Sequence, residues 1–127
     1  MSRHLPDQIL SYLVLHYCSD GPNYGYGIVN DIEELSGGNW SPSYGTIYPL
    51  IQRMVEDGLL EPRPDHGAED RKYYGLTDAG KEKYEEIDEY CEQEQEAFSE
   101  LVLGYLNIFR QAYGEQALDD LLEEFDR

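Results

Sequence analysis

The stretch that decides the fold is WSPSYGTIYPLIQRMVEDGLLEPRP, residues 40–64, followed closely by RKYYGLTDAG, residues 71–80. Apolar residues in the first segment recur three and four apart, which indicates a helix, and Glu-Asp-Gly ends that helix. Two short runs then flank a polar turn, and Thr77 begins a new helix. The predicted elements, in order, are a helix over about 43–56, a strand over about 59–62, a returning strand over about 71–76 and a helix from about 78.

The charge of this helix and hairpin differs from that of the rest of the chain. The helix carries one charge, Arg53, before it reaches Glu56, whereas the whole chain holds 27 Asp and Glu against 9 Lys and Arg. A helix start rich in hydroxyls and free of carboxylate can lie against a polyanion. The returning strand opens with Arg71 and Lys72, which can bind phosphates beside that helix. We therefore expect a winged helix that binds double-stranded DNA.

Two amphipathic helices precede this stretch, over about residues 6–17 and 24–35. A turn, SDGPN, separates them, and Asn23 is the expected N-cap of the second helix. Helical spacing predicts that these two helices bury Ile9, Leu10, Leu13, Val14 and Tyr17, and Tyr24, Ile28, Ile32 and Leu35. The same spacing predicts that the helix over 43–56 buries Ile47, Leu50, Ile51, Met54 and Val55.

The last long helix is predicted over about residues 78–113, with a short amphipathic helix after Gly114. Its heptad seam is apolar apart from Glu94, and a domain of this size cannot bury such a seam alone. The seam therefore predicts a homodimer in which partner helices cover one another. The interface residues expected from the heptad positions are Tyr84, Ile87, Cys91, Phe98, Leu101, Tyr105 and Ile108.

The expected fold class is mainly α with a small two-stranded β wing. The chain is long enough for one modest core and one projecting element. We expect a winged helix-turn-helix DNA-binding domain over residues 1–77 and a C-terminal helical dimerisation arm over residues 78–127.

The formal net charge of −18 argues, taken alone, against nucleic acid. DNA affinity normally comes from Lys and Arg that displace condensed counterions. A folded acidic protein is also what a cytoplasm at molar salt favours, because net charge keeps it soluble there. We therefore predict a halophilic source, in particular a halophilic archaeon. An acidic adaptor that binds protein partners is the alternative.

The sequence lacks the motifs of common enzymes and metal sites. It contains no P-loop, no GxGxxG and no GxSxG, and His4, His16 and His66 have no metal or triad spacing. Cys18 and Cys91 lie far apart on predicted helices, so we expect buried free thiols, with a redox switch as the alternative. We expect no enzymatic activity, no metal and no cofactor. Without an apolar signal core or membrane span, the protein is expected to be cytoplasmic.

At these motifs the chain resembles the PadR family of transcriptional regulators. The resemblance rests on several pieces that occur in order: Tyr24-Gly25-Tyr26, Ser41-Pro42, Gly45-Thr46-Ile47-Tyr48-Pro49-Leu50, Asp57-Gly58-Leu59-Leu60, Arg71-Lys72-Tyr73-Tyr74, Leu76-Thr77 and Gly80. It covers about residues 5–85 closely and the C-terminal helix loosely. The family often has SPGT where this chain has SPSYGT, and the extra residues place Tyr44 where it can alter base contacts.

The resemblance implies a dimeric winged-helix repressor that binds a two-fold operator through the third helix and the wing. It implies DNA contacts by the side chains of Ser41, Ser43, Tyr44, Thr46, Tyr48, Arg71 and Lys72. Further candidates for DNA contact are Tyr24, Arg53 and Arg63.

Several alternatives remain open from the sequence. Tyr48 and Tyr73 can instead be core aromatics, and Arg53 can pair with Glu56 or Asp57, which we favour slightly. A small-molecule effector can bind between subunits near Trp40, although core packing explains Trp40 equally well. The alternative function is an acidic winged-helix module that binds proteins and has lost DNA binding.

Overall fold

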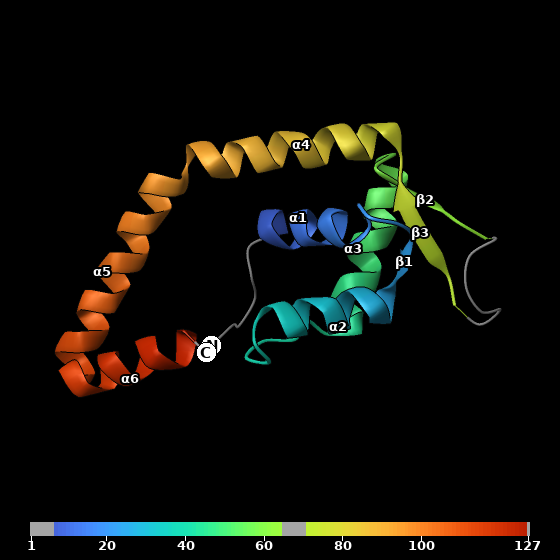
Figure 1. Ribbon diagram of the computed structural model, residues 1–127. Helices are drawn as coiled ribbons and strands as arrows, with labels where there is room; N and C mark the ends of the chain where they lie inside the picture. The colour runs from blue at the N-terminus through green and yellow to red at the C-terminus, as the bar shows by residue number, and fades with distance from the viewer. Residues whose placement is uncertain (1–6, 65–70, 127) are drawn as a thin grey trace. The chain divides into compact units, whose positions relative to one another are not determined.

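The computed structural model describes residues 7–64 and 71–126 (Figure 1). The helices and strands, in chain order, are α1 (Asp7–Tyr17), β1 (Asn23–Tyr24), α2 (Gly25–Leu35), α3 (Tyr44–Glu56), β2 (Leu60–Pro62), β3 (Tyr73–Leu76), α4 (Asp78–Gln93), α5 (Gln95–Tyr113) and α6 (Glu115–Phe125). The chain divides into two compact units after Asp88, within α4. The predicted fold class, mainly helical with a small β wing, is confirmed; a domain boundary at residue 77 stays a prediction.

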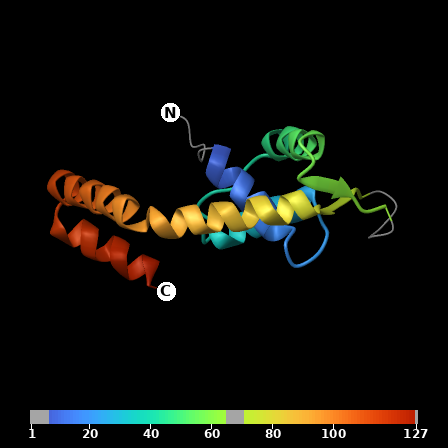
Figure 2. The same ribbon diagram turned by 90° about the horizontal axis from the view of Figure 1, so that it is seen from above.

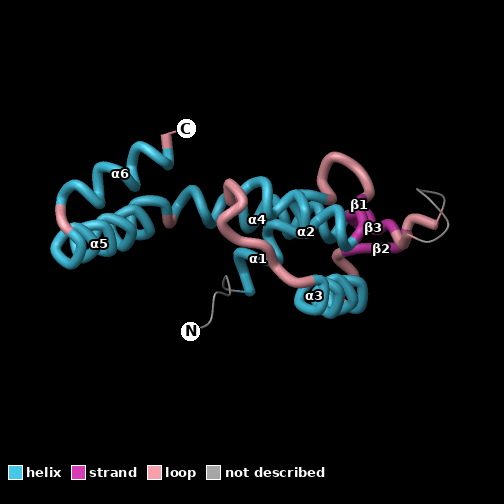
Figure 3. The backbone as a smooth tube through the Cα atoms, turned by 90° about the horizontal axis from the view of Figure 1, so that it is seen from below, coloured by secondary structure: helices cyan, strands magenta, loops and turns pink. Residues whose placement is uncertain are grey.

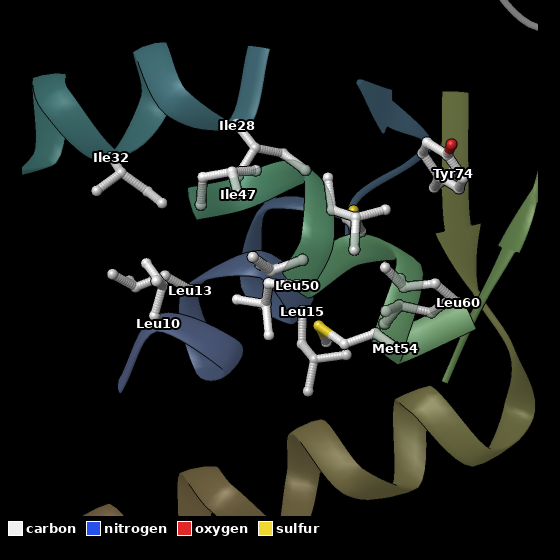
Figure 4. Close-up of a cluster of buried hydrophobic side chains, with 14 residues drawn as sticks. Leu10, Leu13, Leu15, Ile28, Ile32, Ile47, Leu50, Met54, Leu60 and Tyr74 are labelled. Carbon is white, nitrogen blue, oxygen red and sulfur yellow. The ribbon is translucent and has the colours of Figure 1, made fainter. Parts of the chain in front are cut away.

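The first unit is built around one apolar core between α1, α2 and α3. Figure 4 shows side chains from the three helices pointing toward one another, with Leu60 and Tyr74 closing one end. The buried residues are Leu10, Leu13, Val14, Leu15, Cys18, Ile28, Ile32, Ile47, Leu50, Ile51, Met54, Leu60, Tyr74 and Leu76. Hydrophobic burial of this face is what holds the three short helices together.

Three predicted core positions are wrong, and one of them, Tyr24, is half-buried in β1 and lies outside the core cluster. Ile9 is 38% exposed, because the buried face of α1 is centred on Leu10, Val14 and Cys18, one residue further round the helix. Leu35 is 61% exposed, because it is the last residue of α2 and lies beyond the neighbouring helices. Val55 is only half-buried but packs against the core.

The wing has three strands rather than the expected two. They form an antiparallel sheet in the order β1-β3-β2 (Figure 3), with Leu60 opposite Leu76 and Asn23 opposite Tyr74. The third strand, β1, contains Asn23 and Tyr24, which were expected to begin the second helix. Tyr24 is extended instead, with φ −125° and ψ 163°, and α2 starts one residue later. The turn between β2 and β3 lies mostly outside the described residues.

The predicted ends of α3 and the predicted start of α4 are confirmed and are fixed by local caps. Ser43 Oγ accepts a hydrogen bond from the Thr46 amide at 3.2 Å and caps α3. Gly58 follows α3 with φ 77°, a left-handed conformation that favours glycine. Thr77 Oγ1 accepts from the Gly80 amide at 2.9 Å and caps α4. These residues fix the start and the end of α3 and the start of α4.

The first turns of α4 pack against α1 through aromatic side chains. Tyr84 and Tyr12 stack with ring centroids 5.5 Å apart, and Tyr84 Oη lies 2.6 Å from Nδ1 of His16. Tyr12 donates from its hydroxyl to Asp88 at 3.3 Å. Burial, followed by the neighbouring Tyr84 and Asp88, raises the pKa of Tyr12 to about 12. This cluster holds the start of α4 on the first unit.

The second unit begins at Glu89 and contains α5 and α6, which contact one another (Figure 2). Gly114, with φ 96°, separates the two helices. Neither helix buries a residue in the single chain. The large apolar side chains exposed in this unit are Tyr90, Phe98, Leu101, Val102, Leu103, Tyr105, Ile108, Tyr113, Leu121, Leu122 and Phe125.

The prediction of one continuous helix over about 78–113 is wrong, because the helix is interrupted at Glu94, between α4 and α5. Glu94 has ψ 3°, and Glu92 and Glu96 lie on either side of it, one turn apart. Like charges at this spacing destabilise a helix. Cys91, expected to be a buried thiol, is exposed in the single chain, whereas Cys18 is buried as expected.

Candidate nucleic-acid interface

The outer face of α3 exposes hydroxyl side chains and no carboxylate in its first turn. Because Ile47, Leu50, Ile51 and Met54 fill the core, the helix is oriented with Tyr44 and Tyr48 outward, each 37% exposed. Thr46 is half-buried beside them, and its hydroxyl lies 3.0 Å from that of Ser43. Ser41 is exposed just before the helix. The start of α3 therefore presents a polar, uncharged surface.

Three tyrosines form a continuous layer on this surface, which we call the tyrosine stack: Tyr26, Tyr44 and Tyr48. The rings of Tyr26 and Tyr44 are nearly parallel, with an interplanar angle of 9° and centroids 4.4 Å apart. Tyr44 and Tyr48 stack at 5.5 Å and 29°. Burial, followed by the neighbouring Tyr48 and Tyr26, raises the pKa of Tyr44. The stack joins the start of α2 to the start of α3.

The root of the wing brings a cation next to this stack. The guanidinium carbon of Arg71 lies 4.6 Å from the ring centroid of Tyr24, within the range of a cation–π interaction. Tyr24 in turn contacts Tyr73, with centroids 5.1 Å apart. Lys72 is exposed beside Arg71. The two basic residues therefore lie at the edge of an aromatic surface.

An open pocket of about 290 Å³ connects the tyrosine stack with the basic residues of the wing. Its lining comes from the start of α2, the outer face of α3 and the wing: Tyr24, Gly25, Tyr26, Tyr44, Tyr48, Ile51, Arg71, Lys72 and Tyr74. Of the residues that the structure describes, no carboxylate belongs to this lining, although the chain has a net charge of −18. The pocket is therefore a neutral-to-basic surface on an acidic protein.

The model of the PadR-like transcriptional regulator family matches residues 14–86, which is more than half of the chain. The chain belongs to this family. Transcriptional regulator YqjI of Escherichia coli (strain K12) is 32% identical over 95 residues, 75% of this chain and 45% of that protein. The negative transcriptional regulator PadR of Bacillus subtilis (strain 168) is 31% identical over 78 residues, 60% of this chain and 43% of that protein. The chain spans less than half the length of these two relatives.

Solved structures of the PadR-like family share the fold. A PadR-like transcriptional regulator from Bacillus cereus superposes with a TM-score of 0.64 at 28% identity, covering 74% of this chain and 91% of that one. Bacillus subtilis PadR in complex with operator DNA gives a TM-score of 0.54 at 30% identity, covering 61% of this chain and 45% of that one. Each superposition therefore includes more of this chain than α1, α2 and α3.

The two other arginines expected near DNA differ in their surroundings within this PadR-like domain. Arg63 forms an ion pair with Glu61 and donates from Nη2 to the Leu76 carbonyl at 3.1 Å, so it turns back onto the sheet. Arg53 is exposed, and no ion pair joins it to Glu56 or Asp57. The surface pair that the sequence favoured slightly for Arg53 is therefore wrong.

The aromatic alternatives are resolved by burial. Tyr48 lies on the surface and Tyr73 is half-buried, while Tyr74 is the wing tyrosine that enters the core. Gln52 donates to the Tyr74 hydroxyl at 3.1 Å. Trp40 packs against the core, and its backbone is hydrogen-bonded to the Ser36 hydroxyl. Core packing therefore accounts for Trp40, as one of the two alternatives expected.

Sequence reasoning missed Tyr26 as part of this surface. It lies in Tyr24-Gly25-Tyr26, which the sequence analysis noted only as a motif of the family resemblance. No local pattern indicates that Tyr26 meets Tyr44, because that contact joins two helices.

Some absences concern only residues 7–64 and 71–126. Within those ranges, no three His, Cys, Asp or Glu side chains are grouped to hold a metal ion. His4 and His66 lie outside them, and His16 contacts Tyr84. Over the same ranges, no helix has the length and apolar character needed to span a membrane.

Proposed function

We propose that this protein is a sequence-specific DNA-binding transcriptional regulator. It acts as a repressor and binds a two-fold operator as a homodimer through α3 and the wing. One observation carries the proposal: among the residues that the structure describes, 7–64 and 71–126, the pocket between α2, α3 and the wing is lined by tyrosines, Arg71 and Lys72 and by no carboxylate, on a chain of net charge −18. In a winged-helix protein that had lost DNA binding, nothing would select against Asp and Glu at this surface in particular.

In the proposed complex the start of α3 enters the major groove, where side chains on its outer face reach base edges. The residues assigned to this contact are Ser41, Ser43, Tyr44, Thr46 and Tyr48. Arg71 and Lys72 bind phosphates of the adjacent backbone, and Tyr24 supports the Arg71 guanidinium. Arg53 is a further candidate for phosphate contact because it is exposed, and Arg63 is a weaker one because Glu61 neutralises it.

The proposed dimer joins two chains through the apolar residues that the single chain leaves exposed. Phe98, Leu101, Tyr105 and Ile108 lie on α5, and each is more than half exposed. Cys91, exposed on α4, extends this surface, whereas Tyr84 and Ile87, the two other expected interface residues, are half-buried and pack against the core of their own chain. A two-fold dimer matches a two-fold operator, since each subunit then presents α3 to one half-site. An effector between the subunits remains a proposal without assigned residues.

A halophilic archaeal source, and with it a cytoplasmic location beside the cell's DNA, is also proposed. It is supported by the excess of carboxylates over the whole chain. By counterion release, about four to six phosphates neutralised per dimer give a log–log salt slope of roughly −4 to −5. Cation uptake by nearby carboxylates opposes this release, so we expect a shallow or even positive slope. A steep negative slope up to molar salt would contradict this account of the acidic surface.

The function is tested by a mobility-shift titration with the protein's own promoter in molar potassium chloride. Tyr48→Ala and Thr46→Ala should weaken operator binding while leaving the urea unfolding midpoint unchanged, because both side chains lie outside the core. Arg71→Ala should weaken binding to all sequences about equally, since a phosphate contact carries no base information. If Tyr48→Ala and Thr46→Ala both bind the operator as tightly as the parent protein, α3 is not the helix that contacts the bases. No promoter binding at any salt would favour the acidic protein-interaction module.

A further inference from the structure

Tyr26 occupies a position that the core does not explain. It lies near the start of α2, its side chain is 60% exposed, and it is not part of the core cluster. Its ring nevertheless stacks on Tyr44 almost in parallel, at 4.4 Å and 9°. An exposed, face-on contact between the starts of two helices contributes little to burial. Its effect is to fix the direction of the two rings.

The residue before Tyr26 makes room for this contact. A Cβ atom placed on Gly25 would lie 2.6 Å from Cε2 of Tyr44, closer than side chains approach one another. The ring of Tyr44 therefore occupies space that any other residue at position 25 would fill. Two consecutive residues of α2 thus serve the placement of one side chain of α3.

Tyr44 is the residue whose placement needs such support. It is the first residue of α3, and its ring stacks with both Tyr26 and Tyr48. A tyrosine at an exposed helix start would otherwise be free to turn about its side-chain bonds. Fixing a binding side chain before the partner arrives removes part of the entropy cost of binding.

We propose that Tyr26 is a positioning residue of the DNA-reading surface, which holds the Tyr44 ring by stacking so that its hydroxyl meets base edges in one direction. The proposal rests on the proposed function and deepens it. The tyrosine stack then acts as a rigid, uncharged contact layer for the major groove, where hydroxyls bond to base edges and ring edges meet thymine methyl groups. Because no charge is involved, this part of the affinity does not depend on counterion release.

The test uses the full-length dimer and duplex DNA that the parent protein itself selects from a random library. Two variants separate the effect of the ring from that of the hydroxyl. Tyr26→Phe removes the hydroxyl and keeps the ring that stacks on Tyr44. Tyr26→Leu keeps an apolar side chain but removes the ring. The readout is the ratio of affinities for selected and scrambled duplexes, measured at one salt concentration. We expect Tyr26→Leu to lower this ratio about tenfold, the low end of what one base contact contributes, and Tyr26→Phe to stay within about threefold of the parent.

Positioning through Tyr44 makes a second prediction. In a Tyr44→Ala background, Tyr26→Leu should lower the ratio no further than about twofold, because the side chain it positions is gone. Leu35→Ala is the control, since Leu35 is 61% exposed at the end of the same helix, α2, outside this surface, and it should leave the ratio unchanged. Urea midpoints of all variants should equal that of the parent.

The outcomes distinguish a failure of the proposed DNA-binding function from a failure of the role proposed for Tyr26. If the parent selects no sequence, the proposed function fails and the role of Tyr26 fails with it. If the parent selects a sequence but Tyr26→Leu keeps the full ratio, only the role of Tyr26 is overturned. An equal loss in Tyr26→Phe and Tyr26→Leu would also overturn it, because the hydroxyl and not the stack would then act. A full loss in the Tyr44→Ala background would overturn positioning through Tyr44.

Discussion

The two units of the molecule handle their apolar residues in opposite ways. The unit up to Asp88 contains every buried apolar residue of the described chain, and its core is closed by helices and strands from within that unit. The unit from Glu89 onward, α5 and α6, buries none, although it carries Phe98, Leu101 and Ile108. The first unit therefore has what it needs to fold alone, whereas the second needs another surface to cover it.

The exposed apolar surfaces of the two units also differ in chemistry. Besides Ile9 and Leu35, the first unit exposes Tyr26, Tyr44 and Tyr48, whose hydroxyls hydrogen-bond to water when the surface is free and to polar partners when it is bound. The second exposes mainly Phe, Leu, Val and Ile, which gain only from apolar contact. Such a difference is what we expect when one surface meets DNA and the other meets a second copy of the chain.

The largest effect is expected from a charge in the second unit. Phe98→Asp should dissociate the homodimer, because burying an unpaired carboxylate in an apolar interface costs on the order of several kcal/mol. Light scattering in high salt measures the mass directly. Asn107→Asp is the matched control, since it adds the same charge to an exposed polar position of α5. A parent protein that is already monomeric would contradict the comparison between the two units.

The two cysteines give the next test, with one thiol in each unit. Burial raises the pKa of Cys18 to about 12, whereas Cys91 is exposed in the single chain. Because the thiolate is the reactive form, Cys18 should react with a disulfide reagent at pH 8 on the order of a thousandfold more slowly than an ordinary exposed thiol. Cys91 should be protected in the parent dimer and react fast in Phe98→Asp. A fast Cys91 in an intact dimer would remove it from the interface.

Two glycines in helices test packing in the two units with the same substitution. A Cβ on Gly80, in the first turn of α4, would lie 2.0 Å from the Leu59 carbonyl oxygen, whereas a Cβ on Gly104 in α5 meets nothing within 4 Å. Gly80→Ala should lower the free energy of unfolding by about 1–3 kcal/mol, since backbone must move. Gly104→Ala should raise it by up to about 1 kcal/mol through helix propensity. Urea midpoints measure both, and a loss in Gly104→Ala would indicate close helix packing there in the dimer.

Sequence reasoning succeeded where the signal is local. The helix start near residue 43, the helix end at Gly58 and the new helix begun by Thr77 depend on neighbours within a few residues, and all three are confirmed. The core face of α3 was readable for the same reason. Glu94 also had a visible signal, as the one charged position of the seam, but we did not interpret it as a break.

The misses involve contacts between segments far apart in the chain. Strand β1 forms only because Asn23 and Tyr24 pair with Tyr74 and Tyr73 of β3, and nothing near Asn23 predicts that partner. Likewise, Tyr26 joins the candidate site only through Tyr44 on the next helix. Helical periodicity identifies an apolar stripe but not where the neighbouring helix ends, so Ile9 and Leu35 were placed in the core.

The smallest expected effect concerns Gly25 and sharpens the account of the first unit. Gly25→Ala places a Cβ against the Tyr44 ring, which is the outer end of a flexible side chain and can turn aside. The free energy of unfolding should therefore change by less than about 1 kcal/mol, because Ala favours the helix more than Gly does. DNA binding should nevertheless weaken about threefold to tenfold, the effect of losing part of one base contact.

Fluorescence anisotropy with a labelled selected duplex measures the binding change produced by Gly25→Ala, and urea unfolding measures its stability. Gly104→Ala is the control, because it makes the same substitution in α5, for which no DNA contact is proposed. If Gly25→Ala binds as tightly as the parent, the position of Tyr44 does not matter for reading DNA. If it unfolds more easily instead, Gly25 serves the packing of α2. A loss of binding at unchanged stability would separate the reading surface from the core beneath it.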